Sequence, residues 1–479
     1  MSENNHFLAG FFEPKSVAVV GATPNPVKIN YRILQNLVDM GFQGKIYPVN
    51  PKAKEIHGTK AFPRLQDVPD SIDLVISAIP AVKTADIMRD CAEIGTKRVV
   101  IVAGGFSEGG PEGHKLNNEI AKVAKQHNIR ILGPNTLSPV NSVNRLIVSF
   151  NQLSDIKPGI VSFAFQSGFY DPKINWLCAG LGVNKMLDMG NKLDINEIDA
   201  LEFFASDPST KVLAMHVESV RGNGREFFRL LKEIASKKPT IILKTGRTAA
   251  GSRAAASHTG AMALENDVVF DGLIKQTAAI RAHNLEEFFD LAKGFAILPL
   301  PKGNRLATIV MSGGEGVMAT DSCETYGLYQ APIGDETRQK LTGIMPPWEI
   351  PLNPFDAGVC MEFAMHDIDG FYDAMSAIPE DDSVDCSIMQ MPINPLDFIL
   401  SIYNTTEEAA QPIVDRFTEN IIKMQRSGKP LAAWRTSFGL REEKWMESFE
   451  SRGMPVFQSS ERAIKVLAAM HQFNARSSC

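Results

Sequence analysis

Short runs of valine and isoleucine recur along the chain, each separated from the next by a longer segment with amphipathic spacing. The first of these runs, all within residues 15–135, are SVAVVGA, KIYPVNP, LVISAIP, RVVIVAG and IRILGPN. Strands with so few polar positions are buried on both faces, which is typical of parallel sheets covered by helices on each side. The pattern therefore predicts an α/β protein built from open, doubly wound sheets.

The alternation stops and restarts twice, which predicts three domains. The stretch SPVNSVNRLIVSFNQLSDIKPG, residues 138–159, contains Asn, Ser, Pro and Gly, and it is typical of a linker or an edge strand. The second series runs from IVSFAFQSG to AAIRAHN, and the third begins at LATIVMSGGEG after the break LPLPKGNR. A chain of 479 residues agrees with three domains of ~100–200 residues each. We predict domains at residues 1–143, 158–298 and 303–479.

Charge and composition exclude several classes of partner. The net charge of −6 provides no basic field for DNA, RNA or anionic lipid. The N-terminal residues lack the features of a signal peptide, and no apolar run reaches the ~18–20 residues of a membrane span. None of the six cysteines forms a CxxC pair or a zinc spacing. We expect a cytoplasmic protein with reduced thiols, no membrane contact, no nucleic-acid partner and no metal site of its own.

The first strand and turn, VAVVGATPNPVKINYRIL, predict a nucleotide site, because the free amides of a helix start suit a pyrophosphate. GxGxxG is absent, and the next strand ends in Asn50 and Lys52 instead of the Asp or Glu that would bind the ribose of NAD. Asn and Lys would accept the 3′-phosphate of CoA, so the pattern favours CoA over the alternative of an NAD-linked oxidoreductase. The predicted CoA contacts are Gly21, Ala22, Thr23, Lys28, Val49, Asn50, Lys52, Ile79, Pro80, Gly104 and Asn135.

Eight motifs occur in order along the chain: SVAVVGAT, GKIYPVNPK, SAIPA, AGGFSE, GPNTL, GNKLDINEID, KTGR and AAASHTGAMA. Together they resemble the ADP-forming (NDP-forming) acyl-CoA synthetases, relatives of succinyl-CoA synthetase, over almost the whole chain. The resemblance implies an N-terminal Rossmann-like CoA-binding domain followed by two flavodoxin-like, succinyl-CoA synthetase-like ligase domains. Family members also use an ATP-grasp module, for which three α/β domains leave no room, so this chain looks like the alpha subunit alone.

The resemblance further implies a reaction and a partner. The reaction interconverts acyl-CoA, ADP and phosphate with a carboxylic acid, CoA and ATP, through an acyl phosphate and a phosphohistidine. An ATP-grasp beta subunit would bind ADP or ATP with Mg²⁺, in a heterodimer or heterotetramer, and the other ligands are a small carboxylic acid and its CoA thioester. A homologue that binds CoA or acyl-CoA without turnover is the alternative.

His258 is the predicted phosphoryl acceptor, on a loop where alanines and a glycine leave the imidazole uncovered. Glu218 follows a predicted buried strand and could accept the ring N–H, which would fix the tautomer; the family's glutamate at this motif has that role. His216 is a rival nucleophile, but its apolar strand setting favours a core or rim histidine.

Two predicted helix starts supply amides for phosphate, and they are formed by Gln166, Ser167 and Gly168, and by Ser312, Gly313, Gly314 and Gly316. Their pairing on one phosphate is what the resemblance to succinyl-CoA synthetase implies. The chain departs from the family pattern beside both of them, at Phe169, Tyr170, Asp171 and Pro172 and at Glu315. These departures would narrow the acyl pocket or weaken phosphate binding, and they keep the non-catalytic alternative open.

Overall fold

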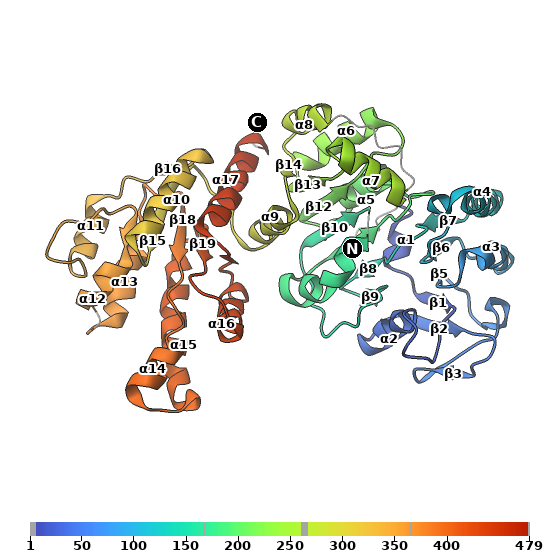
Figure 1. The fold of residues 1–479 in the computed structure, drawn as a ribbon, viewed down its shortest axis with the longest axis horizontal. Helices are drawn as coiled ribbons and strands as arrows, with labels where there is room; N and C mark the ends of the chain where they lie inside the picture. Colours follow the sequence, from blue (N-terminus) through green and yellow to red (C-terminus); the bar gives the residue numbers. More distant parts are fainter. Residues whose placement is uncertain (1–5, 167, 260–266, 365, 478–479) are drawn as a thin grey trace. The chain divides into compact units, whose positions relative to one another are not determined.

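The predicted α/β architecture is confirmed by the computed structural model, which describes residues 6–166, 168–259, 267–364 and 366–477. The chain divides into two compact units, residues 1–288 and 289–479, and helix α9 (Leu285–Ile297) contains the boundary. The described residues of the first unit form two large sheets, and those of the second unit form one (Figure 1). The three predicted domain boundaries remain predictions.

The first sheet is parallel throughout, in the order β2-β1-β5-β6-β7. The chain passes from β1 to β2 on one side and then to β5 on the other, so the strand order reverses between β1 and β5. Open sheets bind ligands at the carboxyl ends of strands beside such a reversal. The strands are β1 (Ser16–Val20), β2 (Lys45–Val49), β5 (Leu74–Ser77), β6 (Arg98–Ile101) and β7 (Arg130–Leu132).

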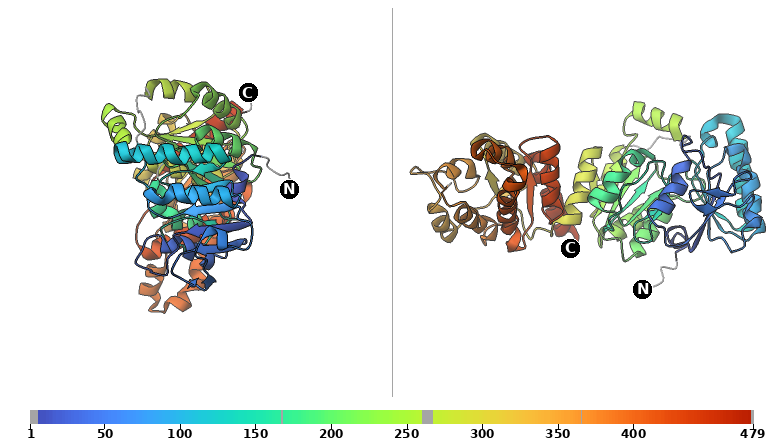
Figure 2. Two further views of the ribbon diagram at one scale, coloured as in Figure 1. Left: turned by 90° about the vertical axis from the view of Figure 1, so that its right-hand side faces the viewer. Right: turned by 90° about the horizontal axis from the view of Figure 1, so that it is seen from below.

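Helices cover this sheet and complete its core. Met88 of α3 and Ile120 of α4 pack in one cluster with Val75 and Val99 of the strands. Helices α3 and α4 lie side by side, as the two views in Figure 2 show. The elements outside the strands are α1 (Ala9–Phe12), α2 (Tyr31–Asp39), α3 (Thr84–Glu93), α4 (Gly110–His127), the short hairpin β3 (Glu55–Ile56) and β4 (Thr59–Lys60), and the single turns η1 (Leu65–Asp67), η2 (Ala81–Lys83) and η3 (Ser107–Gly109).

The second sheet has the order β14-β13-β12-β10-β11-β8-β9. Its first five strands are parallel, whereas β8 and β9 are antiparallel. Residues 138–159, predicted as a linker or an edge strand, therefore include the edge hairpin of this sheet. The strands are β8 (Val140–Asn141), β9 (Leu146–Ile147), β10 (Val161–Phe165), β11 (Lys185–Asp188), β12 (Val212–Val217), β13 (Thr240–Lys244) and β14 (Ile280–Ala282).

The strand order of the second sheet reverses between β10 and β12, so the segments after these two strands lie at its predicted ligand edge. Asn223 caps α6 by accepting hydrogen bonds from two backbone amides, as N-caps do. The helical elements here are η4 (Gly168–Lys173), a π-helical turn η5 (Trp176–Leu181), α5 (Glu197–Ser206), α6 (Gly224–Ala235), α7 (Ala249–Thr259) and α8 (Asp267–Lys275).

The sheet of the second unit has the order β16-β15-β18-β19-β20, and β17 also pairs with β15. Helix α17 packs against α10 and against β18 and β19. The strands are β15 (Arg305–Val310), β16 (Tyr329–Gln330), β17 (Phe355–Asp356), β18 (Cys386–Gln390), β19 (Leu431–Trp434) and β20 (Val456–Phe457). The helices are α10 (Gly313–Thr325), α11 (Asp335–Thr342), α12 (Ala357–Ala364), α13 (Ile368–Glu380), α14 (Leu396–Tyr403), α15 (Glu407–Lys423), η6 (Met424–Ser427), α16 (Leu440–Glu450) and α17 (Ser460–Ser477).

Candidate functional site

Gln166 joins the two strands at which the order of the second sheet reverses. It directly follows β10, and its buried side-chain oxygen accepts the backbone amides of Glu218 (2.9 Å) and Ser219 (3.1 Å), which directly follow β12. Its side-chain nitrogen donates to the Ser219 hydroxyl at 3.3 Å. The structure thus brings together Gln166 and Glu218, two residues predicted for the same site, at the carboxyl edge of the sheet.

Lys192, a buried lysine that the sequence analysis did not predict as a site residue, completes this cluster. The ammonium group of Lys192 donates to the Glu197 carboxylate, to the Ser219 carbonyl at 2.9 Å and to the Ser219 hydroxyl at 3.1 Å. The backbone of Lys192 is left-handed, with φ of +54°, a conformation that costs free energy in a residue with a side chain. A lysine soon after a buried strand, with a glutamate five positions later, was the available signal in GNKLDINEID.

Burial and the neighbouring carboxylates have opposite effects on the pKa of Lys192. Burial lowers the pKa of Lys192, while the negative charges of Glu197 and Glu218 raise it. Glu218 is itself buried, and its backbone carbonyl accepts a hydrogen bond from the Lys244 ammonium at 2.7 Å. Lys192, which follows β11, and Lys244 of the KTGR motif, which ends β13, therefore both place an ammonium group at the carboxyl edge of this sheet.

His258 lies in helix α7, so the prediction of a loop at this position is wrong. The physical reason is composition: the prediction of a loop rests on the alanines around His258, and alanine is the strongest helix former. The side chain of His258 lies outside the described part of the structure, as do Ser167 and residues 260–266. The predicted contact between His258 and Glu218 remains a prediction.

His216, the rival nucleophile, is a core residue. It is buried in β12, and its Nε2 lies 2.8 Å from the Thr245 hydroxyl. Burial lowers the pKa of His216 to about 3, with a smaller contribution from the ammonium groups of Lys244 and Lys192. The ring is therefore neutral over the physiological range and inaccessible to a bulky phosphoryl donor.

The segment after Gln166 corrects a second prediction, because no α-helix begins at Gly168. Gly168–Lys173 form a 3₁₀-helix that contains Pro172, whose missing N–H removes an α-helical hydrogen bond. Tyr170 is buried, stacks on Phe165 with ring centroids 4.5 Å apart, and donates to the Leu137 carbonyl. Asp171 is also buried. Tyr170 and Asp171, two of the residues that depart from the family pattern, therefore make their contacts inside the protein.

The other predicted phosphate segment does begin an α-helix, in the second unit. Ser312 is the N-cap of α10, and Ser312, Gly313 and Gly314 are exposed, whereas Gly316 is buried. The amide of Met311 donates to the Gln390 side chain at 2.7 Å. Gln390 ends β18, beside the strand-order reversal of this sheet, so the Gln166 arrangement has a counterpart here.

The predicted CoA residues form a first group around Gly21, at the reversal point of the first sheet. The Gly21 amide donates to the Val49 carbonyl at 3.1 Å, and the Asn50 side chain donates to the Ala22 carbonyl at 2.8 Å. Gly21 has φ of +87°, and a Cβ there would lie 2.7 Å from the Ala78 carbonyl oxygen and 2.7 Å from Cγ2 of Ile79. Ala22, Thr23 and Val49 are buried, so of these three only the backbones can line a ligand site.

A second group lies at the ends of β6 and β7. A Cβ on Gly104 would meet Glu108 Oε1 at 3.0 Å and Asn135 Oδ1 at 3.4 Å, so the three residues adjoin. Glu108 also accepts a hydrogen bond from Asn191, the neighbour of Lys192. The remaining predicted contacts, Lys28, Lys52 and Pro80, are exposed on the loops of this edge. Two exposed ammonium groups and a glycine-lined surface fit an anionic ligand such as CoA.

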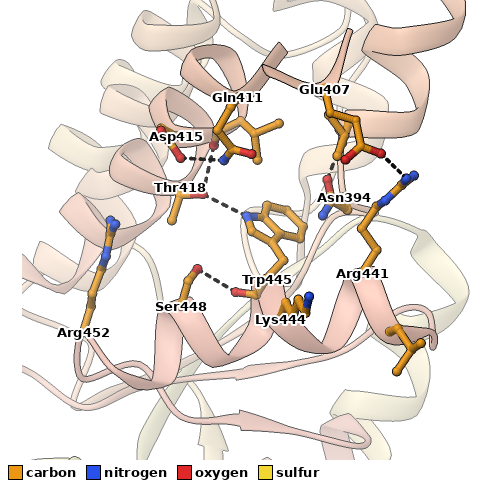
Figure 3. Close-up of a pocket in the computed structure, with 13 residues that line it drawn as sticks. Asn394, Glu407, Gln411, Asp415, Thr418, Arg441, Lys444, Trp445, Ser448 and Arg452 are labelled. Atoms are coloured by element: carbon orange, nitrogen blue, oxygen red, sulfur yellow. Dashed lines mark hydrogen bonds and ion pairs between the residues drawn. The ribbon is translucent and has the colours of Figure 1, made fainter. Parts of the chain in front are cut away.

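A separate cavity of about 440 Å³ lies in the second unit, between α15 and α16 (Figure 3). Trp445 donates to the Thr418 hydroxyl at 2.8 Å in its floor, and Arg441 pairs with Glu407 at its rim. None of the predicted site residues lines it. In the part of the chain that the structure describes, no group of His, Cys, Asp and Glu side chains could hold a metal ion, and no helix could cross a membrane.

Two family models match this chain. A CoA binding domain matches residues 15–141, and a succinyl-CoA ligase like flavodoxin domain matches residues 158–295. The first segment contains the first sheet and strand β8, and the second segment contains strands β10 to β14 of the second sheet, so β9 lies between the two.

Relatives with assigned activities cover nearly the whole chain. The alpha subunit of ADP-forming acetate–CoA ligase I from Pyrococcus furiosus is 34% identical over 98% of both chains. ADP-forming acetate–CoA ligase II from Archaeoglobus fulgidus is 33% identical over 98% of this chain and 67% of its own length. Among solved structures, dinucleotide forming acetyl-coenzyme A synthetase 1 from Ca. Korarchaeum cryptofilum, in complex with phosphate and ADP, matches with a TM-score of 0.83 and 28% identity over 98% of this chain and 97% of its own.

Proposed function

Because the chain belongs to the ADP-forming acyl-CoA synthetase family, we propose that it is the alpha subunit of such an acid–CoA ligase. The observation that carries this assignment is the match to a named alpha subunit over 98% of both chains. The reaction is acyl-CoA + ADP + phosphate ⇌ carboxylic acid + CoA + ATP. Acetate is the acid in the names of the two relatives described above, which makes a small carboxylic acid the first substrate to test.

In the direction of ATP formation, a phosphate oxygen attacks the thioester carbonyl carbon. The C–S bond breaks, CoA leaves as its thiolate, and the product is an acyl phosphate. The neutral imidazole of His258 then attacks phosphorus, the bond between phosphorus and the acyl oxygen breaks, and the carboxylate leaves. The phosphohistidine finally transfers its phosphoryl group to ADP, which an ATP-grasp beta subunit holds together with Mg²⁺.

We assign the remaining residues to binding and orientation. Gln166, Ser167 and Gly168 hold phosphate together with Ser312, Gly313, Gly314 and Gly316, and Glu218 orients the His258 ring. CoA lies along the first sheet at the Gly21 turn, which has no room for a side chain because a Cβ on Gly21 would lie 2.7 Å from the Ala78 carbonyl oxygen. The alpha and beta subunits form a heterodimer or a heterotetramer. The buried, reduced thiols of Cys91, Cys178, Cys323, Cys360 and Cys386 suit the cytoplasm.

Phosphoryl labelling tests this proposal. The chain is incubated with radiolabelled acetyl phosphate alone, and separately with radiolabelled ATP, Mg²⁺ and the beta subunit. We expect an acid-labile, base-stable label on the wild type in both reactions and none on His258→Ala. An unlabelled wild type that still binds CoA would support the non-catalytic alternative, and equal labelling of His258→Ala would refute the assigned nucleophile.

A further inference from the structure

Asp171 fixes the turn that follows Gln166. Its buried carboxylate accepts hydrogen bonds from the Ser149 hydroxyl at 2.6 Å and from the Asn151 side-chain amide at 2.6 Å. The same amide donates to the Asp171 carbonyl at 3.1 Å. Burial raises the pKa of Asp171, and the bonds from Ser149 and Asn151 oppose that shift. The turn at Gly168–Lys173 is therefore fastened to residues 149–151 by bonds to a carboxylate, which are stronger than neutral ones.

Residues 149–153 are held in turn by helix α2 of the first sheet. The buried side-chain amide of Asn36 donates to the Ser149 carbonyl at 3.3 Å and to the Asn151 carbonyl at 2.9 Å. Its oxygen accepts the Leu153 amide at 3.2 Å. Asn36 thus uses both donor and acceptor atoms on a single segment of backbone, which sets the position of that segment against α2.

The start of α2 contacts the glycine turn assigned to CoA. The Asn30 side chain, directly before the helix, donates to the Gly21 carbonyl at 2.6 Å and to the Ala78 carbonyl at 3.4 Å. Because a helix is stiff over so few turns, a shift of the Gly21 turn is carried to Asn36. The first turns of α2 therefore connect the hydrogen bonds of Asn30 at the Gly21 turn with those of Asn36, which lead on through Asn151 to Asp171.

We propose that Asp171 is a positioning residue for phosphate, and that through Asn151 and Asn36 it couples the phosphate turn to occupancy of the CoA site. This inference rests on the proposed function, because it takes Gln166 and Gly168 as phosphate ligands. Displacement of such ligands by about 1 Å has large effects on rate, so the anchoring of this turn bears directly on phosphate use. Asp171 does not itself touch phosphate.

A swap of the two side chains separates positioning from simple stability. Asp171→Asn removes the negative charge and leaves one side-chain oxygen for two donors, and Asn151→Asp puts two carboxylates together, so each single variant weakens the link. The double variant Asp171→Asn/Asn151→Asp restores a charged acceptor facing an amide donor and still offers Ser149 an oxygen, and it gives up only the weaker bond to the backbone carbonyl at position 171. Asp155→Asn is the matched control, because Asp155 is exposed on the same segment.

The readouts are the Kd of inorganic phosphate by calorimetry on the isolated chain, and KM for phosphate and for CoA with the beta subunit. We expect each single variant to weaken phosphate binding by about tenfold or more, as the loss of a charged hydrogen bond allows. The double variant should recover to within about threefold, and Asp155→Asn should match the wild type. Wild-type phosphate affinity in Asp171→Asn, or a loss that the double variant does not recover, would overturn the positioning role.

Coupling is read from the same calorimetry with and without saturating CoA. In the wild type, CoA should change the phosphate Kd by about fivefold or more, and Asn36→Ala should bring that factor close to one. A phosphate Kd that CoA leaves unchanged in the wild type would refute the coupling. Phosphate binding can be measured without turnover, so an inactive wild type would refute the proposed function while these binding results would still decide the inference.

Discussion

The ammonium group of Lys192 hydrogen-bonds the carboxylate of Glu197 where the two side chains are only 4% and 0% exposed. Through the Ser219 carbonyl and hydroxyl, this pair also sets the backbone whose amides hold Gln166. A buried ion pair therefore underlies the candidate phosphate site.

Lys192→Met should destabilise the first unit by about 3–5 kcal/mol, because it leaves the Glu197 charge buried without its partner. Urea unfolding followed by circular dichroism measures the loss. Lys192→Met/Glu197→Leu should recover much of it, since the uncompensated charge is gone. A loss below about 1 kcal/mol in the single variant would show that the pair does not support the site.

Gly21→Ala should reduce CoA affinity by about tenfold or more, because the new Cβ would lie 2.7 Å from the Ala78 carbonyl oxygen in the turn assigned to CoA. Gly41→Ala is the control: φ is +75° at Gly41, and no described atom lies within 4 Å of the added Cβ. Both variants should lose about 1 kcal/mol of stability from the left-handed backbone. Calorimetric titration with CoA separates the two, and equal affinities would remove Gly21 from the CoA site.

His216→Gln should retain phosphoryl labelling from acetyl phosphate, whereas His258→Gln should lose it. The ring of His216 is buried and is held at its Nε2 by Thr245. Scintillation counting of the acid-labile, base-stable fraction checks both variants in one experiment. A label that disappears with His216 and persists without His258 would reverse the two assignments.

His216 should also make the protein less stable in mild acid. Its folded pKa of about 3 lies below the unfolded value of 6.5, so the unfolded chain binds the proton more tightly and stability falls as pH decreases from 6.5. Between pH 7.5 and pH 5 this group should contribute a loss of about 2 kcal/mol. His216→Gln should remove that part of the pH dependence in urea unfolding, and unchanged curves would contradict the burial of a neutral ring.

Asp188 should have the opposite effect to His216 and make the folded protein more stable as pH falls. Burial raises the pKa of Asp188 from 3.8 to about 6, against the opposing hydrogen bonds from the Leu137 and Gly190 amides. The folded protein therefore binds this proton more tightly, so the contribution of Asp188 to stability is present below pH 4 and is lost as pH rises through 6. The stability of the wild type relative to Asp188→Asn should fall by about 1 kcal/mol between pH 5 and pH 7.

The sequence was sufficient for the sheets, because most of the apolar runs in it form strands that are buried on both faces, such as β1, β5, β10 and β12. It was also sufficient for Gln166 and Glu218, since both directly follow such runs and strand ends meet at one edge of a parallel sheet. The eight ordered motifs were likewise sufficient to identify the acyl-CoA synthetase family.

Local pattern failed where two properties of the same residues competed. The alanines around His258 indicate clearance and also favour a helix, and helix α7 forms. Pro172 prevents an α-helix after Gly168, although the preceding strand and glycine are typical of a helix start. Lys192 was not predicted as a site residue in the sequence analysis. One of its partners, Ser219, lies 27 residues after Lys192 in the sequence, and only the tertiary structure brings the two together.

The edge hairpin has a consequence for how the chain is made. Strands β8 and β9 precede the rest of the second sheet in the sequence, and β8 pairs with β11 on the side that would otherwise be open. On the ribosome, the residues that protect this edge are thus synthesised before the strand they protect. A fragment that began at residue 158, where the match to the succinyl-CoA ligase like domain starts, would leave β11 with a row of unpaired amides and carbonyls, available to a neighbouring chain.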